Sequence, residues 1–265
     1  MIIYKNIIIG ASEEGIALAS SLAGAGRETV MISSNYPKDF QVIEGVEFVE
    51  AEVIYLQYSH GLFILSTLSG EVKGTISGLN IILATGTKAV KTSFKNQNIC
   101  YKSSDLPGRH KSEAVVVYGN NDDAATYALD LSKRFYYVYL CTKEFELACK
   151  PKLIKKIGET ANIVHLPGCS ILSCKNDKNG KLSEVTLDTY ATIKSSGLLF
   201  ALGKLPDIPI FVKRFIKLTD QGFIEVKDFN ESTNVPGIFA IGGLCESFTK
   251  RDIQKLAEFL KKKGS

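Results

Sequence analysis

The 265-residue sequence contains no tryptophan, two methionines and no pair of cysteines in a Cys-x-x-Cys arrangement. Its cysteines and three histidines also lack the spacing of a zinc site, so no metal site is predicted. Cys169 and Cys174 lie close along the chain, but their spacing alone does not indicate a disulfide. In a reducing compartment we expect most of the six cysteines to be buried thiols: Cys100, Cys141, Cys149, Cys169, Cys174 and Cys245.

Long apolar runs are missing as well. Gly10, Glu13 and Glu14 interrupt the apolar N-terminal stretch, which is therefore too short to be a signal peptide. No other apolar run approaches membrane-spanning length. We therefore expect a cytoplasmic protein that does not bind a membrane. The net charge of +4 is spread along the chain except for the basic run 261–263, which is typical of a solvated helix end. Nucleic acid is accordingly not an expected partner.

The sequence does contain an ordinary share of apolar residues, 45%, and enough length for two domains. Its most informative stretch is Lys5 to Gly15, an apolar strand that leads into a glycine turn and a helix rich in small residues. In a dinucleotide-binding unit, one glycine makes this turn, a second lets the backbone approach the pyrophosphate and a third packs the helix on the strand. Gly10 and Gly15 hold the first and third places, and Ser12 holds the second.

The charge at this turn is unusual for a phosphate site. Glu13 and Glu14 lie at the helix N-terminus, where free N–H groups and the helix dipole would otherwise attract an anion. Two interpretations stay open. Either Ser12 caps a helix whose acidic first turn stabilises it without any anion, or a cofactor binds in a way that the motif does not describe. The next strand ends in the neutral residues 33–35, where an acid often holds a ribose.

The strand–turn–helix–strand pattern occurs twice. After the first unit, single strands are predicted over 46–58 and 61–66, and a second unit begins with a strand over 113–119. A turn over 120–124 follows, in which asparagines could adopt left-handed backbone angles, and then a helix over 125–134. This repeat predicts an α/β protein with two Rossmann-like domains.

Five landmarks follow one another in a fixed order: the two glycine turns, the strands that end at Gly86 and Gly203, and the stretch Val235 to Gly243. Over nearly the whole chain this order resembles the low-molecular-weight thioredoxin reductases. The resemblance implies a three-layer ββα fold in which an FAD-binding-like domain, residues 1–105 and 217–265, is interrupted by an NAD(P)-binding-like domain, residues 106–216. It also implies these candidate cofactor-binding residues: Gly10, Ser12, Gly15, Thr85, Gly86, Gly119, Asn121, Gly242 and Gly243.

The dithiol of that family has no counterpart here. In the family, electrons pass from nicotinamide to flavin to a Cys-x-x-Cys pair that precedes the first strand of the inserted domain. Residues 101–105 stand at that place and contain no cysteine. Thiol–disulfide exchange needs an attacking and a resolving sulfur, so reduction of thioredoxin by this route is not expected. The catalytic residues therefore stay unassigned, with Cys100 and Tyr101 as outside candidates.

Other contacts implied by the resemblance are also altered. Asn120 and Asn121 replace two of three glycines in the second turn, and Lys143 beside Glu144 replaces the basic cluster that binds the NADPH phosphate. Both changes argue against NAD(P)H as a cofactor. In the flavin half, Gly243 replaces an acid, and the connection that follows Ser34 is much shorter than in the family.

Two functional hypotheses remain. The first is a diverged thioredoxin reductase-like oxidoreductase that uses FAD without a dithiol and passes electrons to a small redox protein or a small-molecule acceptor. The second is a cofactor-free pseudo-reductase that acts as a binding or regulatory module. Nucleotide binding without redox chemistry lies between them. The resemblance also implies a homodimer.

Overall fold

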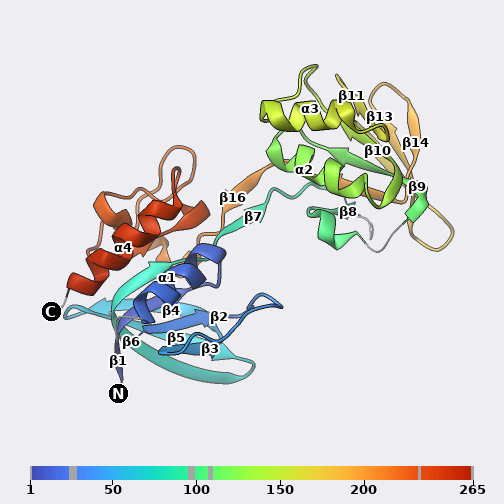
Figure 1. Ribbon diagram of the computed structural model, residues 1–265. Coiled ribbons are helices and arrows are strands. Elements are labelled where there is room, and N and C mark those ends of the chain that lie inside the picture. The colour runs from blue at the N-terminus through green and yellow to red at the C-terminus, as the bar shows by residue number, and fades with distance from the viewer. Residues whose placement is uncertain (1, 24–28, 95–98, 107–109, 232–233, 264–265) are drawn as a thin grey trace. The chain divides into compact units, whose positions relative to one another are not determined.

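The computed structural model describes residues 2–23, 29–94, 99–106, 110–231 and 234–263. The chain forms two compact units (Figure 1). Unit 1 combines both ends of the chain, residues 1–88 and 205–265, and unit 2 is the segment 89–204 between them. The chain passes from one unit to the other along β7 (Thr87–Ala89) and β16 (Lys204–Pro206), which pair as a two-stranded sheet.

These limits differ from the domain boundaries expected near residues 105 and 216. The strand β8 (Ile99–Cys100) pairs with a strand of unit 2, and the Arg134 guanidinium donates to the carbonyl oxygens of Ser103 and Leu106. These contacts attach the segment after residue 89 to unit 2. At the other boundary, Val212 and Ile216 are buried in the core of unit 1. Long-range packing of this kind is not visible in the local sequence pattern.

Unit 1 is built on a mixed sheet whose strand order is β3-β2-β1-β6-β5-β4, with β17 also paired to β6. β1, β2, β3 and β17 join β6 in a parallel half, and β4 and β5 form an antiparallel half. The strand bounds are β1 (Ile3–Ile9), β2 (Thr29–Ser33), β3 (Val46–Glu50), β4 (Glu52–Ser59), β5 (Leu62–Ser69), β6 (Val72–Leu83) and β17 (Ile238–Ala240).

The predicted single strand over 46–58 is wrong, because it divides into β3 and β4 at Ala51. The Ala51 amide donates to the Ser33 carbonyl (3.1 Å), and Ala51 is buried. After this contact the chain continues from one edge of the sheet, β3, to the opposite edge, β4. The break depends on a partner about 20 residues away, so a window of alternating residues could not indicate it.

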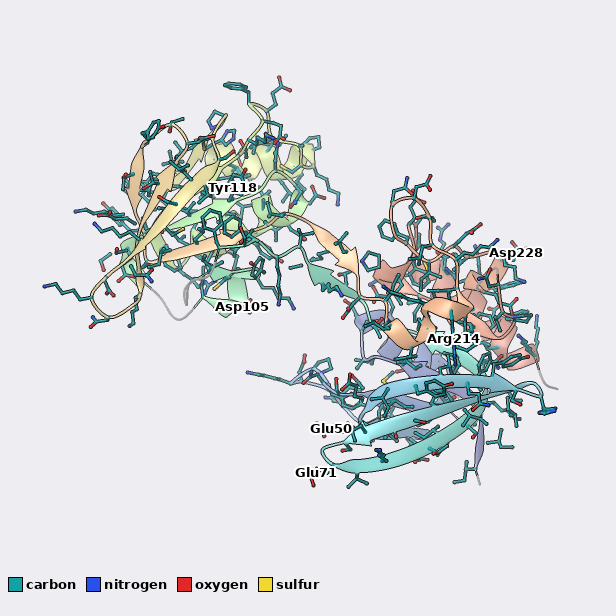
Figure 2. The ribbon with its side chains drawn as sticks, turned by 180° about the vertical axis from the view of Figure 1, so that it is seen from behind. Glu50, Glu71, Asp105, Tyr118, Arg214 and Asp228 are labelled. Atoms are coloured by element: carbon teal, nitrogen blue, oxygen red, sulfur yellow. The ribbon has the colours of Figure 1, made fainter. Side chains whose placement is uncertain are left out.

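The helices α1 (Glu13–Ala23) and α4 (Lys250–Lys262) cover one face of the unit 1 sheet (Figure 1). Leu18, Leu22, Leu256 and Leu260 supply a shared apolar core with the inner strands. The other face is covered by the antiparallel half and by the 3₁₀ helix η2 (Ile210–Phe215). Arg214, which is labelled in Figure 2, lies on this side of the sheet. It donates to the Leu56 carbonyl and lies over the Tyr55 ring. Two further 3₁₀ turns are η3 (Asp228–Asn230) and η4 (Gly242–Leu244).

Unit 2 has three layers. Its central layer is a parallel sheet in the order β11-β10-β9-β15-β8. The helices α2 (Asp122–Leu131) and α3 (Pro151–Glu159) pack on one face of this sheet, and a three-stranded antiparallel sheet packs on the other face. The helix α3 was not predicted from the sequence. The remaining bounds are η1 (Ser103–Asp105), β9 (His110–Tyr118), β10 (Phe135–Cys141), β11 (Ile163–Leu166), β12 (Ile171–Asn176), β13 (Leu182–Leu187), β14 (Thr192–Lys194) and β15 (Gly197–Phe200).

Among the described residues, no helix combines the length and the apolarity that a bilayer crossing requires. The sequence indicated that the basic run at the end of α4 is solvated, but one of its residues, Lys263, contacts other side chains. The Lys263 ammonium lies 3.3 Å from a Glu231 carboxylate oxygen and 5.0 Å from the centre of the Phe239 ring. Glu231 also accepts from the Gly237 amide (2.8 Å) and pairs with Lys227 (3.1 Å). This cluster ties the end of the chain to the sheet.

Because of the Glu231 cluster, we expect the stability of the fold to decrease at acid pH. Burial raises the pKa of Glu231, but the Gly237 amide and the two lysines outweigh burial and hold the pKa below its usual range. A carboxyl group whose pKa is lower in the folded state stabilises the fold at pH values above its unfolded-state pKa. This stabilisation is lost as the pH falls through the folded-state pKa. Glu231→Gln should therefore lower the free energy of unfolding by about 1–3 kcal/mol at neutral pH and by much less near pH 3, as measured in urea. The exposed Glu71→Gln is the control, and an equal loss at both pH values would contradict the assignment.

Candidate cofactor sites at two glycine turns

The first glycine turn is determined by packing. β1 ends at Ile9, and Gly10 follows with a φ of +99°. A Cβ at Gly10 would lie 2.5 Å from the Ala84 carbonyl oxygen, and one at Gly15 would lie 2.8 Å from the Ala84 Cβ. Both glycines thus let the turn and α1 approach the end of β6. These are the structural roles that the sequence predicted: Gly10 makes the turn, and Gly15 lets the helix pack on the strand.

Ser12 is the N-cap of α1. Its hydroxyl accepts from the Gly15 amide (3.2 Å), and Glu13 and Glu14 form the acidic first turn. This arrangement confirms the interpretation of Ser12 as a capping residue. The cap uses the amide of the third helical residue.

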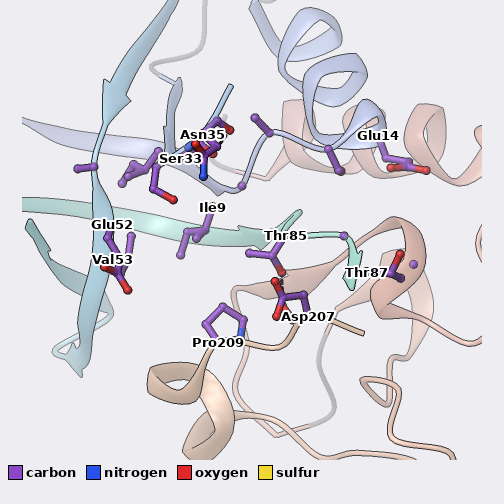
Figure 3. A pocket seen from close by; sticks show the side chains of 18 of the residues that line it. Ile9, Glu14, Ser33, Asn35, Glu52, Val53, Thr85, Thr87, Asp207 and Pro209 are labelled. Atoms are coloured by element: carbon purple, nitrogen blue, oxygen red, sulfur yellow. Dashed lines mark hydrogen bonds between the residues drawn. The ribbon is translucent and has the colours of Figure 1, made fainter. Parts of the chain in front are cut away.

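A cavity of about 750 Å³ opens in front of this turn. It lies at the carboxyl ends of β1, β2 and β6, which is where ligands bind in open α/β sheets (Figure 3). Of the cofactor-binding candidates in unit 1, Gly15 and Gly242 are outside its lining. The residues that line it include the turn 10–14, the neutral segment 33–35, residues 51–53, residues 85–87, Asp207 and Gly243.

Thr85 and Asp207 form the lower wall of the cavity in Figure 3. The Thr85 hydroxyl donates to the Asp207 carbonyl oxygen (2.7 Å), and the Asp207 amide donates to the Gly86 carbonyl oxygen (3.0 Å). The Asp207 carboxylate pairs with Lys88 (2.9 Å). These bonds fix the chain after β6, so Thr85 acts as a positioning residue for the wall.

The cavity is rich in negative charge. Glu13, Glu14 and Glu52 line it together with Asp207. Among the described residues, only Asp207 of these four has an ion-pair partner. An anionic ligand in this cavity would therefore meet three unpaired carboxylates, which lowers its affinity unless they turn away.

Gly242 and Gly243, two of the expected cofactor-binding residues, have close neighbours from this chain itself. Gly242 has a φ of +66°, and the Glu14 carboxylate lies 2.9 Å from the position of a Cβ on it. A Cβ on Gly243 would lie 2.3 Å from the Thr87 Cγ2. Thr87 thus occupies the space that a side chain at position 243 would need. Sequence reasoning missed Thr87 and Glu52, which line this cavity, and Lys88, which pairs with Asp207, because nothing in the local pattern brings these residues together.

The second glycine turn follows β9 in unit 2. Gly119 has a φ of +152°, and a Cβ on it would lie 2.2 Å from the Ala201 carbonyl oxygen. Asn121 is the N-cap of α2: its Oδ1 accepts from the Ala124 amide (2.9 Å), and its Nδ2 donates to the Ala201 carbonyl (2.8 Å). The prediction of left-handed asparagines is wrong for Asn121, whose φ is −154°. An N-cap takes extended angles, so the turn forms without them.

Gly119 and Asn121 line a separate cavity of about 480 Å³ within unit 2. The two outside candidates for chemistry lie elsewhere in the same unit. Cys100 is buried in β8, and burial together with Asp105 raises the pKa of its thiol to about 11. A thiol with so high a pKa is a poor nucleophile at neutral pH. The Tyr101 hydroxyl accepts from the Thr92 amide (3.0 Å), so it has a structural role.

The family model of the pyridine nucleotide-disulphide oxidoreductases matches residues 35–258. The chain therefore belongs to this family, and it has the two-domain FAD/NAD(P)-binding fold of thioredoxin reductase. The thioredoxin reductase of T. acidophilum has a TM-score of 0.81 at 20% identity, covering 98% of both chains. A bacillithiol disulfide reductase from Bacillus cereus has a TM-score of 0.75 at 18% identity, covering 99% of this chain and 100% of that one.

Proteins similar in sequence include two reductases. A ferredoxin–NADP reductase of Orientia tsutsugamushi is 27% identical over 195 residues, covering 68% of this chain and 57% of that protein. A thioredoxin reductase of Chlamydia pneumoniae is 23% identical over 237 residues, covering 83% of this chain and 73% of that one. The chain thus spans little more than half the length of the Orientia reductase.

The contact between Gly243 and Thr87 can be tested by restoring a side chain. Gly243→Asp should lower the free energy of unfolding by about 0.5–1.5 kcal/mol, because the new Cβ overlaps the Thr87 methyl group and forces this exposed side chain out of its rotamer. Thr87→Ala in the same protein should recover most of the loss, since the Thr87 Cβ itself lies at an ordinary 3.6 Å. Gly158→Asp, which has open space around it, is the control. Equal melting temperatures for the Gly243 single and double variants would show that Thr87 does not restrict this position.

Proposed function

We propose that this protein is a diverged thioredoxin reductase-like oxidoreductase that binds FAD in unit 1 and transfers electrons without a Cys-x-x-Cys dithiol. The observation that carries the proposal is the cavity in front of the Gly10 turn, which lies at the carboxyl ends of three parallel strands. Its volume, about 750 Å³, is within the range of cofactor sites. Family membership supports a flavin rather than another dinucleotide.

The residues at the turn fit a dinucleotide in shape. Gly10 allows the close turn, Gly86 faces open space apart from the Ser12 Cβ at 3.7 Å, and the neutral residues 33–35 line the same cavity. The Gly10 turn and the first turn of α1 would hold the pyrophosphate, and Ser33 to Asn35 would hold the ribose by neutral hydrogen bonds. When bound, the flavin supplies hydride and one-electron chemistry.

The acceptor is not expected to be reduced through a dithiol of this chain, which has no Cys-x-x-Cys pair. Relatives of this fold include enzymes named for acceptors other than thioredoxin: a ferredoxin–NADP reductase and a bacillithiol disulfide reductase. They support an acceptor that is either a small redox protein or a small molecule.

A cofactor-free binding or regulatory module is the second candidate. It is favoured by the Glu14 carboxylate, which lies against Gly242, and by Thr87, which fills the space beside Gly243. The two acids in the first turn of α1, Glu13 and Glu14, also suit a helix that binds no phosphate. The two candidates make opposite predictions for FAD binding.

The deciding experiment is to measure flavin in the purified protein. If the proposal is correct, the protein is yellow or takes up FAD, releases flavin absorbance on denaturation, and melts at a higher temperature as FAD is added. A colourless protein whose melting temperature is unchanged by millimolar FAD would reject the proposal and leave the cofactor-free module.

The carboxylates at the turn provide a sharper test. Glu13→Gln together with Glu14→Gln keeps the shape of both side chains and removes two negative charges from the cavity lining. We expect FAD affinity, measured by fluorescence titration, to rise by about tenfold or more, because each charge near the pyrophosphate costs on the order of 1 kcal/mol. Glu71→Gln, on an exposed turn of the same unit, should leave the affinity unchanged. An unchanged affinity in the double variant would place the pyrophosphate away from α1.

A further inference from the structure

We infer that unit 2 bonds the polar groups of its second glycine turn to its own residues and therefore binds neither NADH nor NADPH in the cavity of about 480 Å³ at that turn. The inference concerns a different site from the proposed flavin site and does not rest on it. It is carried by the closing segment, residues 144–150, which follows β10 and is bonded across the N-terminus of α2.

The closing segment is held by the asparagine that follows Gly119. The Asn120 Oδ1 accepts from the Ala148 amide (2.7 Å), and its Nδ2 donates to the Glu146 carbonyl (2.9 Å) and the Glu144 carboxylate (3.0 Å). In a nucleotide-binding turn this place belongs to the backbone that approaches the pyrophosphate. Here one side chain makes three bonds to the closing segment instead.

The first turn of α2 is also engaged. The Asp122 carboxylate accepts from the Lys150 amide and pairs with the Lys150 ammonium, both at 2.8 Å. Asp123 pairs with Lys204 (2.9 Å). These ion pairs are partly exposed and contribute little to stability by themselves. Their consequence for a ligand is larger, because a pyrophosphate would have to displace the lysines and would then face two bare carboxylates.

Apolar contacts anchor the same segment. Leu147 and Cys149 pack against the core that α2 shares with the parallel sheet. The Thr142 hydroxyl donates to the Glu144 carbonyl (2.7 Å) and fixes the start of the segment. The segment is therefore attached at its start, middle and end.

The charge where a 2′-phosphate would bind is unfavourable as well. Lys143 is the basic residue of the cavity lining, and Glu144 lies beside it. The hydrogen bond from Asn120 holds the pKa of Glu144 below its usual range, so this carboxylate is ionised at neutral pH. One lysine next to a carboxylate does not form the paired forks that recognise a phosphate.

Hydrogen exchange followed by mass spectrometry tests the inference on the intact chain. In the wild type, millimolar NADH or NADPH should leave exchange unchanged in the peptides that cover 119–124 and 144–150. Slower exchange in either peptide would overturn the inference. Because exchange is resolved by peptide, binding of the same nucleotide at the Gly10 turn would be seen separately and would not be confused with binding in unit 2.

The closing contacts are tested by an opened variant, Asn120→Ala with Asp122→Ala. Amide exchange over 144–150 should become about tenfold faster, because the variant loses acceptors for the Ala148 and Lys150 amides. Lys155→Ala, on the exposed side of α3, should leave exchange over 144–150 unchanged. If the opened variant unfolds, Asn120→Ala alone carries the same test. Unaltered exchange in a folded variant would show that these side chains do not hold the segment.

Discussion

The structure of both units depends on the close approach of a glycine turn to the end of a neighbouring strand. A Cβ at Gly10 would lie 2.5 Å from the Ala84 carbonyl oxygen, and one at Gly119 would lie 2.2 Å from the Ala201 carbonyl oxygen. Both glycines also take positive φ angles that other residues rarely adopt. The approach brings each helix N-terminus to the carboxyl edge of its parallel sheet and so creates a cavity at that edge.

The two turns share this architecture and differ in how they use charge. Each helix is capped by its own side chain, Ser12 or Asn121, and each carries two acids in its first turn. In unit 2 these acids are paired with Lys150 and Lys204, and a neighbouring segment is bonded across the turn. In unit 1 the corresponding Glu13 and Glu14 have no ion-pair partner among the described residues. The fold thus leaves the acids of one turn unpaired and neutralises those of the other.

How far the sequence predicted the protein depended on the range of the contacts involved. The strands that lead into the two glycine turns and the Ser12 cap are indicated by residues a few positions apart, and these predictions were confirmed. The break at Ala51 and the role of Lys263 were missed, because each depends on a partner distant in sequence, Ser33 or Glu231. The unit boundaries differ from expectation for the same reason, since β8 pairs with β15 and η2 packs on β4.

The sequence by itself therefore determined the class of fold, the position of both glycine turns and the absence of a Cys-x-x-Cys pair. Those features follow from local spacing and composition. Only the tertiary structure decided which carboxylates are neutralised, that Thr87 fills the space beside Gly243, and that residues 144–150 cover the second turn. Each of these is a contact between segments that the sheet brings together, and its effect on a cofactor depends on distances that residue spacing does not encode.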